Sequence, residues 1–157
     1  MIIKHILGDA TMPEGEGPKV IVHVCNDLGK WGKGFVLAIS RRWKTPEDSY
    51  RKAFSSPEKP ALGDVQFVAV SDTITVANLI GQHGVARKGS RGEPPIRYLA
   101  LRQGLEKVAT FALAQGASVH MPRIGCGLAG GTWDKIEPLI HESLLLRNIP
   151  VFVYDLA

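Results

Sequence analysis

Residues 121–132 are the part of this chain that most constrains its fold. The segment reads Met-Pro-Arg-Ile-Gly-Cys-Gly-Leu-Ala-Gly-Gly-Thr, with four glycines between positions 125 and 131. An apolar, strand-like run at 117–121 precedes it, and an amphipathic, helix-like pattern follows it. Glycines let backbone N–H groups face and approach a ligand, and a helix N-terminus adds partial positive charge. The segment therefore predicts either an anion-binding turn or an ordinary glycine-rich connection between a strand and a helix.

Another glycine-rich loop lies earlier in the chain, at residues 26–34, and it also follows an apolar run. In chain order it is the first glycine-rich loop, and the segment after residue 121 contains the second. Residues 20–25 are almost continuously apolar, which is typical of a strand covered on both faces of its sheet. His23 within this run is interpreted as a hydrogen-bonded core residue. In an α/β sheet, loops at the carboxyl ends of strands can meet at one crevice. The two loops together therefore indicate a single ligand site.

The rest of the chain predicts alternating strands and helices. Expected strands cover residues 2–7, 20–25, 64–70, 73–80, 117–121 and 151–154. Expected helices are residues 35–43, a short helix opened by Pro46, a long helix from Pro94 and Pro95 to Gly116, and a last helix across 136–144. Pro138 is expected to delay the regular part of the last helix. This alternation predicts a three-layer α/β domain, with helices on both faces of one sheet.

Composition favours one globular domain spanning residues 1–157. Of the 157 residues, 45% are hydrophobic and 22% are charged, which argues against disorder. No apolar run approaches the ~20 residues of a membrane span, and the N-terminus has no signal-peptide pattern. We therefore expect a cytoplasmic protein that contacts no membrane. The formal charge of +4 favours anionic ligands only weakly.

Three other chemistries are disfavoured by the residue pattern. Two cysteines, Cys25 and Cys126, are too few for a disulfide framework and lack metal-ligand spacing, and no base partner is evident that would activate Cys126. Cys126 is therefore interpreted as a packing residue. The sequence also contains no Walker A motif, Gly-x-Ser-x-Gly elbow or His-x-x-x-His pair. The basic stretch formed by Arg87, Lys88 and Arg91 is interpreted as a solvated surface rather than a nucleic-acid site.

A dinucleotide site is a more serious rival. Gly125-x-Gly127-x-x-Gly130 fits the dinucleotide fingerprint, and Asp155 ends the following strand, where a ribose-binding carboxylate could lie. The motif falls close to the end of the chain, however, and leaves no room for the strands that a dinucleotide fold places after it. The topology therefore disfavours this rival.

Four motifs in order along the chain resemble the macro domain family. They are Gly8-Asp9, Cys25-Asn26-Asp27 with Gly32-Lys33-Gly34, the run from Pro122 to Gly127, and Phe152-Val153-Tyr154. Within that family, His-Val-Cys-Asn-Asp, Lys-Trp-Gly-Lys-Gly and Met-Pro-Arg-Ile-Gly-Cys-Gly-Leu resemble one small branch. That branch contains terminal ADP-ribose protein glycohydrolase, the macro module of a chromatin remodeller and a yeast ADP-ribose 1″-phosphate phosphatase. The resemblance implies an ADP-ribose ligand, a mixed sheet of about six strands between helices, and neither a cofactor nor a metal.

The same resemblance implies which residues bind the ligand. Asp9, with Ala10 beside it, would accept the adenine amino group, Tyr154 would lie beside the adenine ring, and Asn26 would bind the distal ribose. The other expected ligand residues are Gly32, Lys33, Gly34, Phe35, Val36, Gln82, Arg123, Ile124, Gly125, Cys126, Gly127, Leu128, Ala129 and Gly130. Without the resemblance, Asp9 and Asn26 also fit turn residues, and Tyr154 also fits a core residue at a strand end.

The resemblance leaves the activity open. Gln82 and Ala129 stand where the glycohydrolase has a lysine and an aspartate, so a covalent lysine intermediate is not expected. A mechanism in which the site orients an attacking water molecule is still compatible with the sequence. Asn26 would orient the ribose, and Asp27 or His83 would assist proton transfer if either faces the pocket.

The expected function is therefore hydrolysis of ADP-ribosyl linkages on acidic side chains or a related acceptor. Alternatives are a non-catalytic ADP-ribose reader, or a phosphatase acting on ADP-ribose 1″-phosphate, in which Asn26 and His23 would matter more. The expected partner is ADP-ribose or an ADP-ribosylated macromolecule, with nucleic acid only as a modified substrate. A monomer is expected.

Overall fold

The computed structural model describes residues 1–85 and 92–156, so the surface predicted around Arg87, Lys88 and Arg91 lies outside the described residues. Within the described part, six strands form one sheet in the order β1-β6-β5-β2-β4-β3. The strands are β1 (Lys4–Leu7), β2 (Lys19–Asn26), β3 (Val65–Ala69), β4 (Ile74–Gln82), β5 (Ser118–Met121) and β6 (Val151–Asp155). The helices are α1 (Phe35–Arg42), α2 (Thr45–Phe54), α3 (Tyr98–Gln115), α4 (Trp133–Ser143) and a 3-10 helix, η1 (Leu145–Arg147).

The sheet is parallel except at one edge. Only β3 runs antiparallel to its neighbour, β4, and the other strand pairs are parallel. β2 lies between β5 and β4, and all of its residues except Val24 are buried. This position explains its continuous apolar sequence, since a central parallel strand has no solvent-facing side. The sheet confirms the mixed, roughly six-stranded architecture that the resemblance implied.

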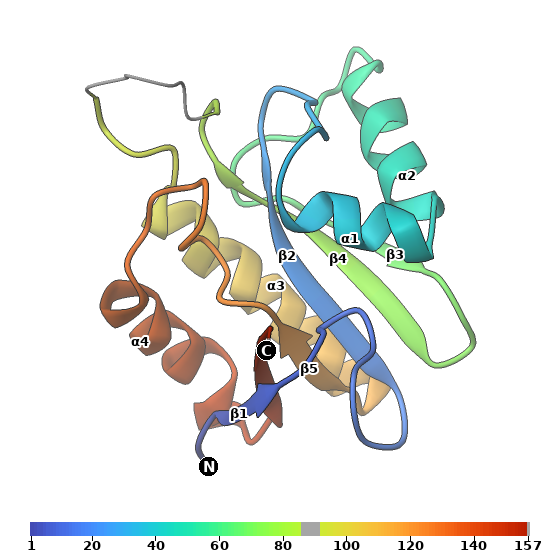
Figure 1. Ribbon diagram of the computed structural model, residues 1–157, viewed down its shortest axis with the longest axis vertical. Coiled ribbons are helices and arrows are strands. Elements are labelled where there is room, and N and C mark those ends of the chain that lie inside the picture. The colour runs from blue at the N-terminus through green and yellow to red at the C-terminus, as the bar shows by residue number, and fades with distance from the viewer. Residues whose placement is uncertain (86–91, 157) are drawn as a thin grey trace.

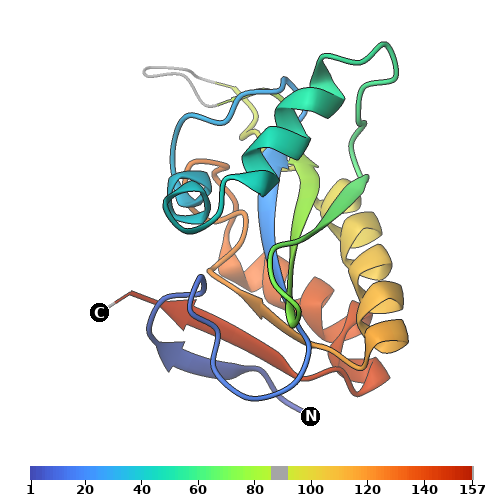
Figure 2. The same ribbon diagram turned by 90° about the vertical axis from the view of Figure 1, so that its right-hand side faces the viewer.

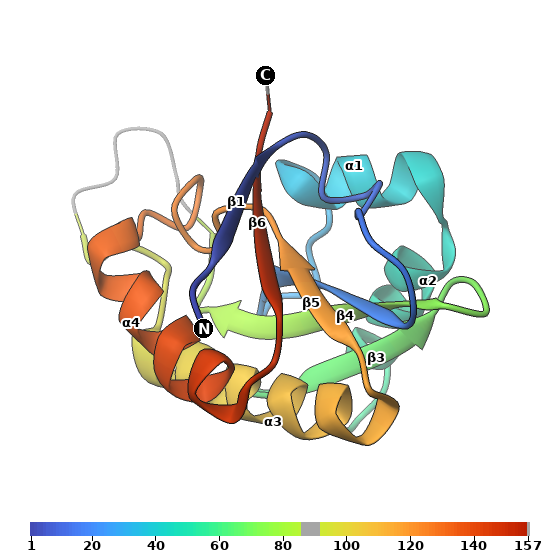
Figure 3. The same ribbon diagram turned by 90° about the horizontal axis from the view of Figure 1, so that it is seen from below.

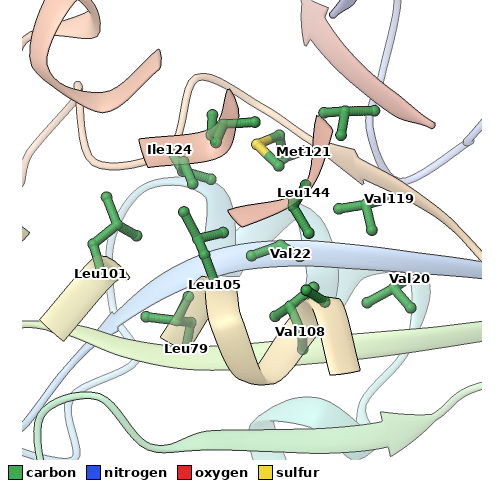
Figure 4. Close-up of a cluster of buried hydrophobic side chains, with 14 of the residues drawn as sticks. Val20, Val22, Leu79, Leu101, Leu105, Val108, Val119, Met121, Ile124 and Leu144 are labelled. Carbon is green, nitrogen blue, oxygen red and sulfur yellow. The ribbon is translucent and has the colours of Figure 1, made fainter. Parts of the chain in front are cut away.

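Helices cover both faces of the sheet, which makes the predicted three-layer sandwich. Figures 2 and 3 show α1 and α2 on one face and α3 and α4 on the other. The larger core lies under α3 and α4, where side chains such as Val22, Leu105 and Val119 pack together (Figure 4). A smaller core lies under α1 and α2 and contains Trp31 and Tyr50. Each core anchors the helices from one side, so the sheet and its strand ends form a fixed frame.

The predicted start of α3 is wrong. The helix begins at Tyr98, after the Pro94-Pro95 pair. The residues before it are instead extended, and the Ile96 N–H donates a hydrogen bond to the Ala129 carbonyl at 2.9 Å. Long-range backbone pairing therefore sets this boundary, and the two prolines do not. The predicted end of α3 is confirmed, since Gly116 caps it in the left-handed conformation.

Most other boundaries differ from expectation by one or two residues, and two of the differences have a clear structural cause. β4 continues to Gln82, two residues beyond its predicted end, because Gln82 pairs with Asn26 of β2 after a register shift. α4 begins at Trp133, so Pro138 does not delay it but lies inside it. A proline there removes only the hydrogen bond to the carbonyl of Asp134, which is in the first turn of the helix.

Candidate binding cleft

Loops gather at the carboxyl edge of the sheet. The parallel strands end there, and the loops after β2, β4 and β5 lie at the same end of the molecule, at the top of Figure 1. Two neighbouring cavities of ≈ 360 Å³ and ≈ 320 Å³ open among them. They share lining residues from all three loops, including Lys33, Gln82 and Leu128. We call them together the cleft; each is as large as a typical small-molecule site.

Most of the residues expected to bind ligand line this cleft. From the expected set, the first cavity is lined by Asn26, Gly32, Lys33, Val36, Gln82 and Leu128. The second is lined by Lys33, Gly34, Phe35, Val36, Gln82, Arg123, Ile124, Gly125, Gly127, Leu128 and Ala129. The expected residues outside both lining sets are Asp9, Ala10, Asp27, His83, Cys126, Gly130 and Tyr154.

The second glycine-rich loop, residues 122–132, folds back on itself through its own backbone. The Gly131 N–H donates to the Gly125 carbonyl at 2.7 Å, and the Gly130 N–H donates to the Gly127 carbonyl at 3.0 Å. Gly125 adopts a φ of 73°, which a residue with a side chain rarely takes. Among the described residues, no acceptor is present for the backbone N–H groups of Gly127 and Leu128. Both residues line the cleft, so these donors are available to an anion.

The first glycine-rich loop ends at the N-terminus of α1, which also faces the cleft. Gly34 is the N-cap and supplies no capping side chain, and the first turn of α1 contains no acidic residue. In the described part of the chain, the N–H groups of Phe35 and Val36 have no acceptor, although both residues line the cleft. A helix start with free N–H groups attracts negative charge. Lys33, beside it, adds a full positive charge.

Leu128 joins the two loops across the cleft. A Cβ placed on Gly34 would lie 3.5 Å from Leu128 Cδ1, so the leucine side chain lies against the opposite loop. Leu128 lines both cavities and is nonetheless 56% exposed. The cleft is therefore bridged by an apolar side chain, with backbone donors on either side.

Asn26 lies in the cleft but is largely engaged with its own loop. Its side-chain oxygen accepts from the Leu28 and Lys30 N–H groups at 2.9 and 3.2 Å, and its amide nitrogen donates to the Lys30 carbonyl at 2.7 Å. The hydroxyl of Tyr50 donates to the same side-chain oxygen at 2.9 Å. These contacts use one of the two amide N–H donors and leave the other for a ligand. Asn26 thus combines the turn role and the cleft position that the sequence left as alternatives.

Asp27 and His83 are hydrogen-bonded to each other and are not among the lining residues of the cleft. His83 Nδ1 lies 2.7 Å from Asp27 Oδ2, and the Gly84 N–H donates to Asp27 Oδ1 at 2.8 Å. Partial burial opposes ionisation of the Asp27 carboxyl, but the bonds from Gly84 and His83 outweigh it and lower its pKa. Both carboxylate oxygens therefore connect the ends of β2 and β4. The pair holds loops together, and its geometry supplies no support for a catalytic role.

Gln82 and Ala129 both line the cleft, as expected. The Gln82 amide nitrogen donates to the Gly84 carbonyl at 2.9 Å, so this side chain is partly engaged. The Ala129 carbonyl accepts from Ile96 and its side chain is 6% exposed. Neither residue can act as the lysine or the aspartate of the glycohydrolase, because an amide and a methyl group neither attack carbon nor transfer protons at neutral pH.

Residues expected at the adenine end are engaged within the protein. Asp9 Oδ1 accepts from the N–H and the hydroxyl of Thr11 at 2.8 and 2.7 Å, which is an Asx turn. Tyr154 is 4% exposed, and its hydroxyl accepts from the Glu14 N–H at 2.9 Å and lies 2.8 Å from His120 Nδ1. Both residues therefore hold the loop after β1. Their contact with adenine stays a prediction.

Arg123 and Asp155 form a two-pronged ion pair beside the cleft. Arg123 Nε lies 2.7 Å from Asp155 Oδ1, and its Nη2 lies 3.0 Å from Oδ2. The hydrogen bonds from Arg123 lower the pKa of the Asp155 carboxyl. Asp155 is held by Arg123 and is not among the lining residues of either cavity, which counts against the dinucleotide rival. Burial raises the pKa of Cys126, which agrees with its interpretation as a packing residue.

His23 is a core residue, as the sequence suggested. It is 1% exposed, and its Nε2 lies 2.6 Å from Asn78 Oδ1. Burial lowers the pKa of His23 to about 4, more than the hydrogen bond to Asn78 raises it. The imidazole is therefore neutral at pH 7, below the floor of the second cavity.

Five lining residues were missed by the sequence reasoning: Val24, Cys25, Lys30, Val85 and Pro122. Lys30 lies within the first glycine-rich loop, so loop position was a signal that could have found it. Val85 carries no such signal, because its position depends on where β4 ends. Among the described residues, no group of three or more His, Cys, Asp or Glu is placed to hold a metal ion. No helix of the described chain is both long and apolar enough to cross a membrane.

Comparison with known proteins places the chain in a family. A macrodomain protein from Streptomyces coelicolor is 52% identical, with a TM-score of 0.85 and coverage of 99% of each chain. A protein from Bacteroides thetaiotaomicron, described as of unknown function, is 58% identical with a TM-score of 0.95 and the same coverage. No model of a known protein family matches the sequence. Because the macrodomain protein from Streptomyces coelicolor is 52% identical over nearly its full length, the chain belongs to the macro domain family, which confirms the resemblance.

One curated relative extends well beyond this domain, and another has about the same length. Chromodomain-helicase-DNA-binding protein 1-like of Mus musculus is 35% identical over 97% of this chain but only 17% of its own length. The chain therefore spans about a sixth of that relative. A protein named ADP-ribose 1''-phosphate phosphatase, from Lodderomyces elongisporus, is 23% identical over 99% of this chain and 100% of its own length.

Proposed function

We propose that this protein binds ADP-ribose in the cleft and hydrolyses ADP-ribosyl linkages, releasing ADP-ribose from an acidic side chain or a related acceptor. The observation that carries the binding proposal is the set of unused backbone N–H groups at Phe35, Val36, Gly127 and Leu128. Donors from two loops suit a diphosphate, which presents oxygens on both sides of a bent linker. Bovine ADP-ribose glycohydrolase OARD1, 37% identical over 38% of this chain, supports the same ligand class.

The charge of the cleft agrees with an anionic ligand. Its charged lining residues are Lys30, Lys33 and Arg123, and the lining sets of the two cavities include no Asp or Glu. Arg123 is neutralised by Asp155, which leaves the two lysines of the first loop as the main positive charges. A diphosphate with two negative charges would balance them.

The same lining constrains the chemistry. With no carboxylate base among the lining residues, the reaction must rely on an oriented water and on a leaving group that needs no proton. An ester between the ribose and a carboxylate meets this requirement. Water oxygen would bond to the anomeric carbon, the bond from that carbon to the ester oxygen would break, and the carboxylate would leave as an anion. The proton lost by the attacking water would pass to bulk water. The spare N–H of Asn26 would orient the ribose.

A non-catalytic reader is the second candidate, and a specific observation favours it. The candidate proton-transfer residues, Asp27 and His83, pair with each other outside the lining residues. The chromatin-remodeller relative is 35% identical across nearly the whole chain. A reader would need only the backbone donors, which the cleft supplies.

One pair of measurements separates these candidates. Isothermal titration calorimetry with ADP-ribose tests binding, and incubation with a glutamate-ADP-ribosylated peptide tests release of ADP-ribose. We expect both to be positive. Binding without release would leave the reader, and an absence of binding would reject the proposal. Phosphate release from ADP-ribose 1″-phosphate, assayed in parallel, tests the phosphatase alternative, in which Asn26 and His23 would be required.

A further inference from the structure

Tyr50 of α2 is a buried residue outside the cleft with a direct contact to it. Its side chain is 0% exposed, yet its hydroxyl lies 2.7 Å from the main-chain oxygen of Asn26 and 2.9 Å from its side-chain oxygen. A phenol hydroxyl carries a single proton, so the two oxygens share one donor. One group on α2 therefore fixes both the end of β2 and the orientation of the Asn26 amide.

The orientation of that amide decides the shape of the first loop. Asn26 Oδ1 accepts from Leu28 and Lys30 as well as from Tyr50, while Nδ2 donates to the Lys30 carbonyl. A flipped amide would place an NH₂ group against the Leu28 and Lys30 N–H groups and an oxygen against the Lys30 carbonyl, so the loop itself opposes the flip. Tyr50 contacts the correctly oriented amide oxygen from α2, and this orientation keeps residues 28–30 wrapped around the amide.

The rest of α2 supports the same loop. The Tyr50 ring packs against Trp31, with ring centroids 5.3 Å apart, and Arg51 donates to the Trp31 carbonyl at 3.3 Å. Gly29 adopts a φ of 81°, and a Cβ there would lie 2.9 Å from Phe54 Cβ. α2 therefore packs directly against the loop that carries Lys30 and Lys33 into the cleft. Of these contacts, only the Tyr50 hydroxyl reaches the amide of Asn26 itself.

We propose that Tyr50 is a positioning residue for the ligand cleft. Acting through Asn26, its hydroxyl holds residues 28–33 in the bound-state geometry before any ligand arrives, with the spare Asn26 N–H directed to the ligand. Preorganisation of this kind raises affinity because the loop does not have to be ordered on binding. The identity of the ligand rests on the proposed function, whereas the loop geometry does not.

The test compares Tyr50→Phe with Phe54→Leu. The first removes the hydroxyl and keeps the ring, and the second loosens the same aromatic cluster without touching Asn26. Amide hydrogen exchange at Leu28 and Lys30 reports the loop, and calorimetry with ADP-ribose reports the cleft. For Tyr50→Phe we expect about tenfold faster exchange at these two amides and about tenfold weaker binding, both measured well below the melting temperature. Phe54→Leu is expected to lower the melting temperature without either change.

Three results would overturn the proposal. Unchanged exchange at Leu28 and Lys30 in Tyr50→Phe would show that the hydroxyl does not hold the loop. Equal effects of Phe54→Leu would show that general loosening is sufficient, and faster exchange with undiminished ADP-ribose affinity would show that loop order does not serve binding. If the wild-type protein binds no ADP-ribose, the proposed function fails, and the exchange data alone still decide whether Tyr50 positions the loop.

Discussion

At the scale of single residues, the polar side chains near the cleft are mostly bonded to their own backbone. Asp9 closes a turn on Thr11, Asp27 binds Gly84, and Asn26 wraps residues 28–30. Each would have been a plausible ligand contact from its position in the sequence alone. Among the groups left unused are backbone N–H donors, and in the second loop their availability depends on glycine at a few positions. Substitutions at glycines are therefore the sharpest test of the cleft.

Gly127→Val is expected to abolish most ADP-ribose binding while leaving the fold intact. A Cβ at Gly127 would meet no atom within 4 Å, and its φ lies outside the left-handed region. Because Gly127 lines the cleft, a larger side chain would occupy ligand space without straining the protein. We expect affinity to fall at least about tenfold, with little change in melting temperature. Calorimetry and thermal unfolding measure the two quantities.

Gly125→Ala is the contrasting variant in the same loop, because a side chain at this position is expected to strain the protein. Its φ of 73° disfavours alanine, and the new Cβ would lie 2.9 Å from Ile96 Cδ1. We therefore expect a loss of stability of about 1–3 kcal/mol. If Gly127→Val bound ADP-ribose as tightly as the wild type, the second cavity would not be the ligand site.

At the scale of elements, the closest packing in the larger core is between α3 and β4. A Cβ on Gly104 of α3 would lie only 2.4 Å from Cγ of Leu79 on β4. Helical sequences ordinarily gain stability when alanine replaces glycine. Here the helix axis lies so close to the sheet that the absence of a side chain is required.

Gly104→Ala is accordingly expected to destabilise the protein by about 1–3 kcal/mol, despite the better helix propensity of alanine. Denaturant unfolding followed by circular dichroism measures the change. In a Leu79→Ala background, which is itself destabilised, Gly104→Ala should cost less than in the wild type, because the atoms that clash are absent. A stabilising effect of Gly104→Ala would mean that α3 can move away from β4 at no cost.

Elements are also joined around the rim of the cleft. Asp27 binds the Gly84 N–H after β4, and the His83 N–H donates to the Pro95 carbonyl at 2.8 Å. Ile96 then donates to Ala129 in the second loop. Three loops that are distant in sequence are thereby connected in series, which explains why α3 starts later than its prolines suggested.

At the scale of the whole molecule, two buried histidines make stability depend on pH. Burial lowers the pKa of His23 and of His120 to about 4, and the Lys19 charge adds to the effect at His120. In the unfolded chain both would titrate near 6.5. The unfolded state therefore binds more protons than the folded state between pH 6.5 and 4, so these groups stabilise the fold above pH 6.5 and lose that contribution as pH falls towards 4.

The unfolding free energy is therefore expected to fall as pH is lowered from 6.5 to 4, by up to about 1.4 kcal/mol per pH unit for each histidine. Denaturant unfolding across this range measures the slope. His120→Phe should reduce the slope by removing one of the two groups, and His141→Gln, at an exposed position on α4, is the matched control. A flat profile would show that neither histidine is held neutral by burial.

The sequence by itself determined the elements, the two glycine-rich loops and the family. Apolar runs, glycines and prolines act over a few residues, so β2, α1, the end of α3 and the loop of residues 122–132 could be found from local pattern. That the two loops meet at one cleft followed from the rule that parallel strands end at one edge, whereas the choice of Asn26, Lys33 and Gln82 came from the resemblance to the macro domain family.

Only the tertiary structure decided which of those residues are free to bind. Asp27 faces His83 across 56 positions of sequence, and Tyr50 reaches Asn26 across 24. Strand register, the start of α3 and the pairing of Asp27 with His83 arise from such long-range contacts. A hydrogen-bonding group engaged by a distant residue has the same local sequence as a free one, which is the physical reason that the sequence could not separate them.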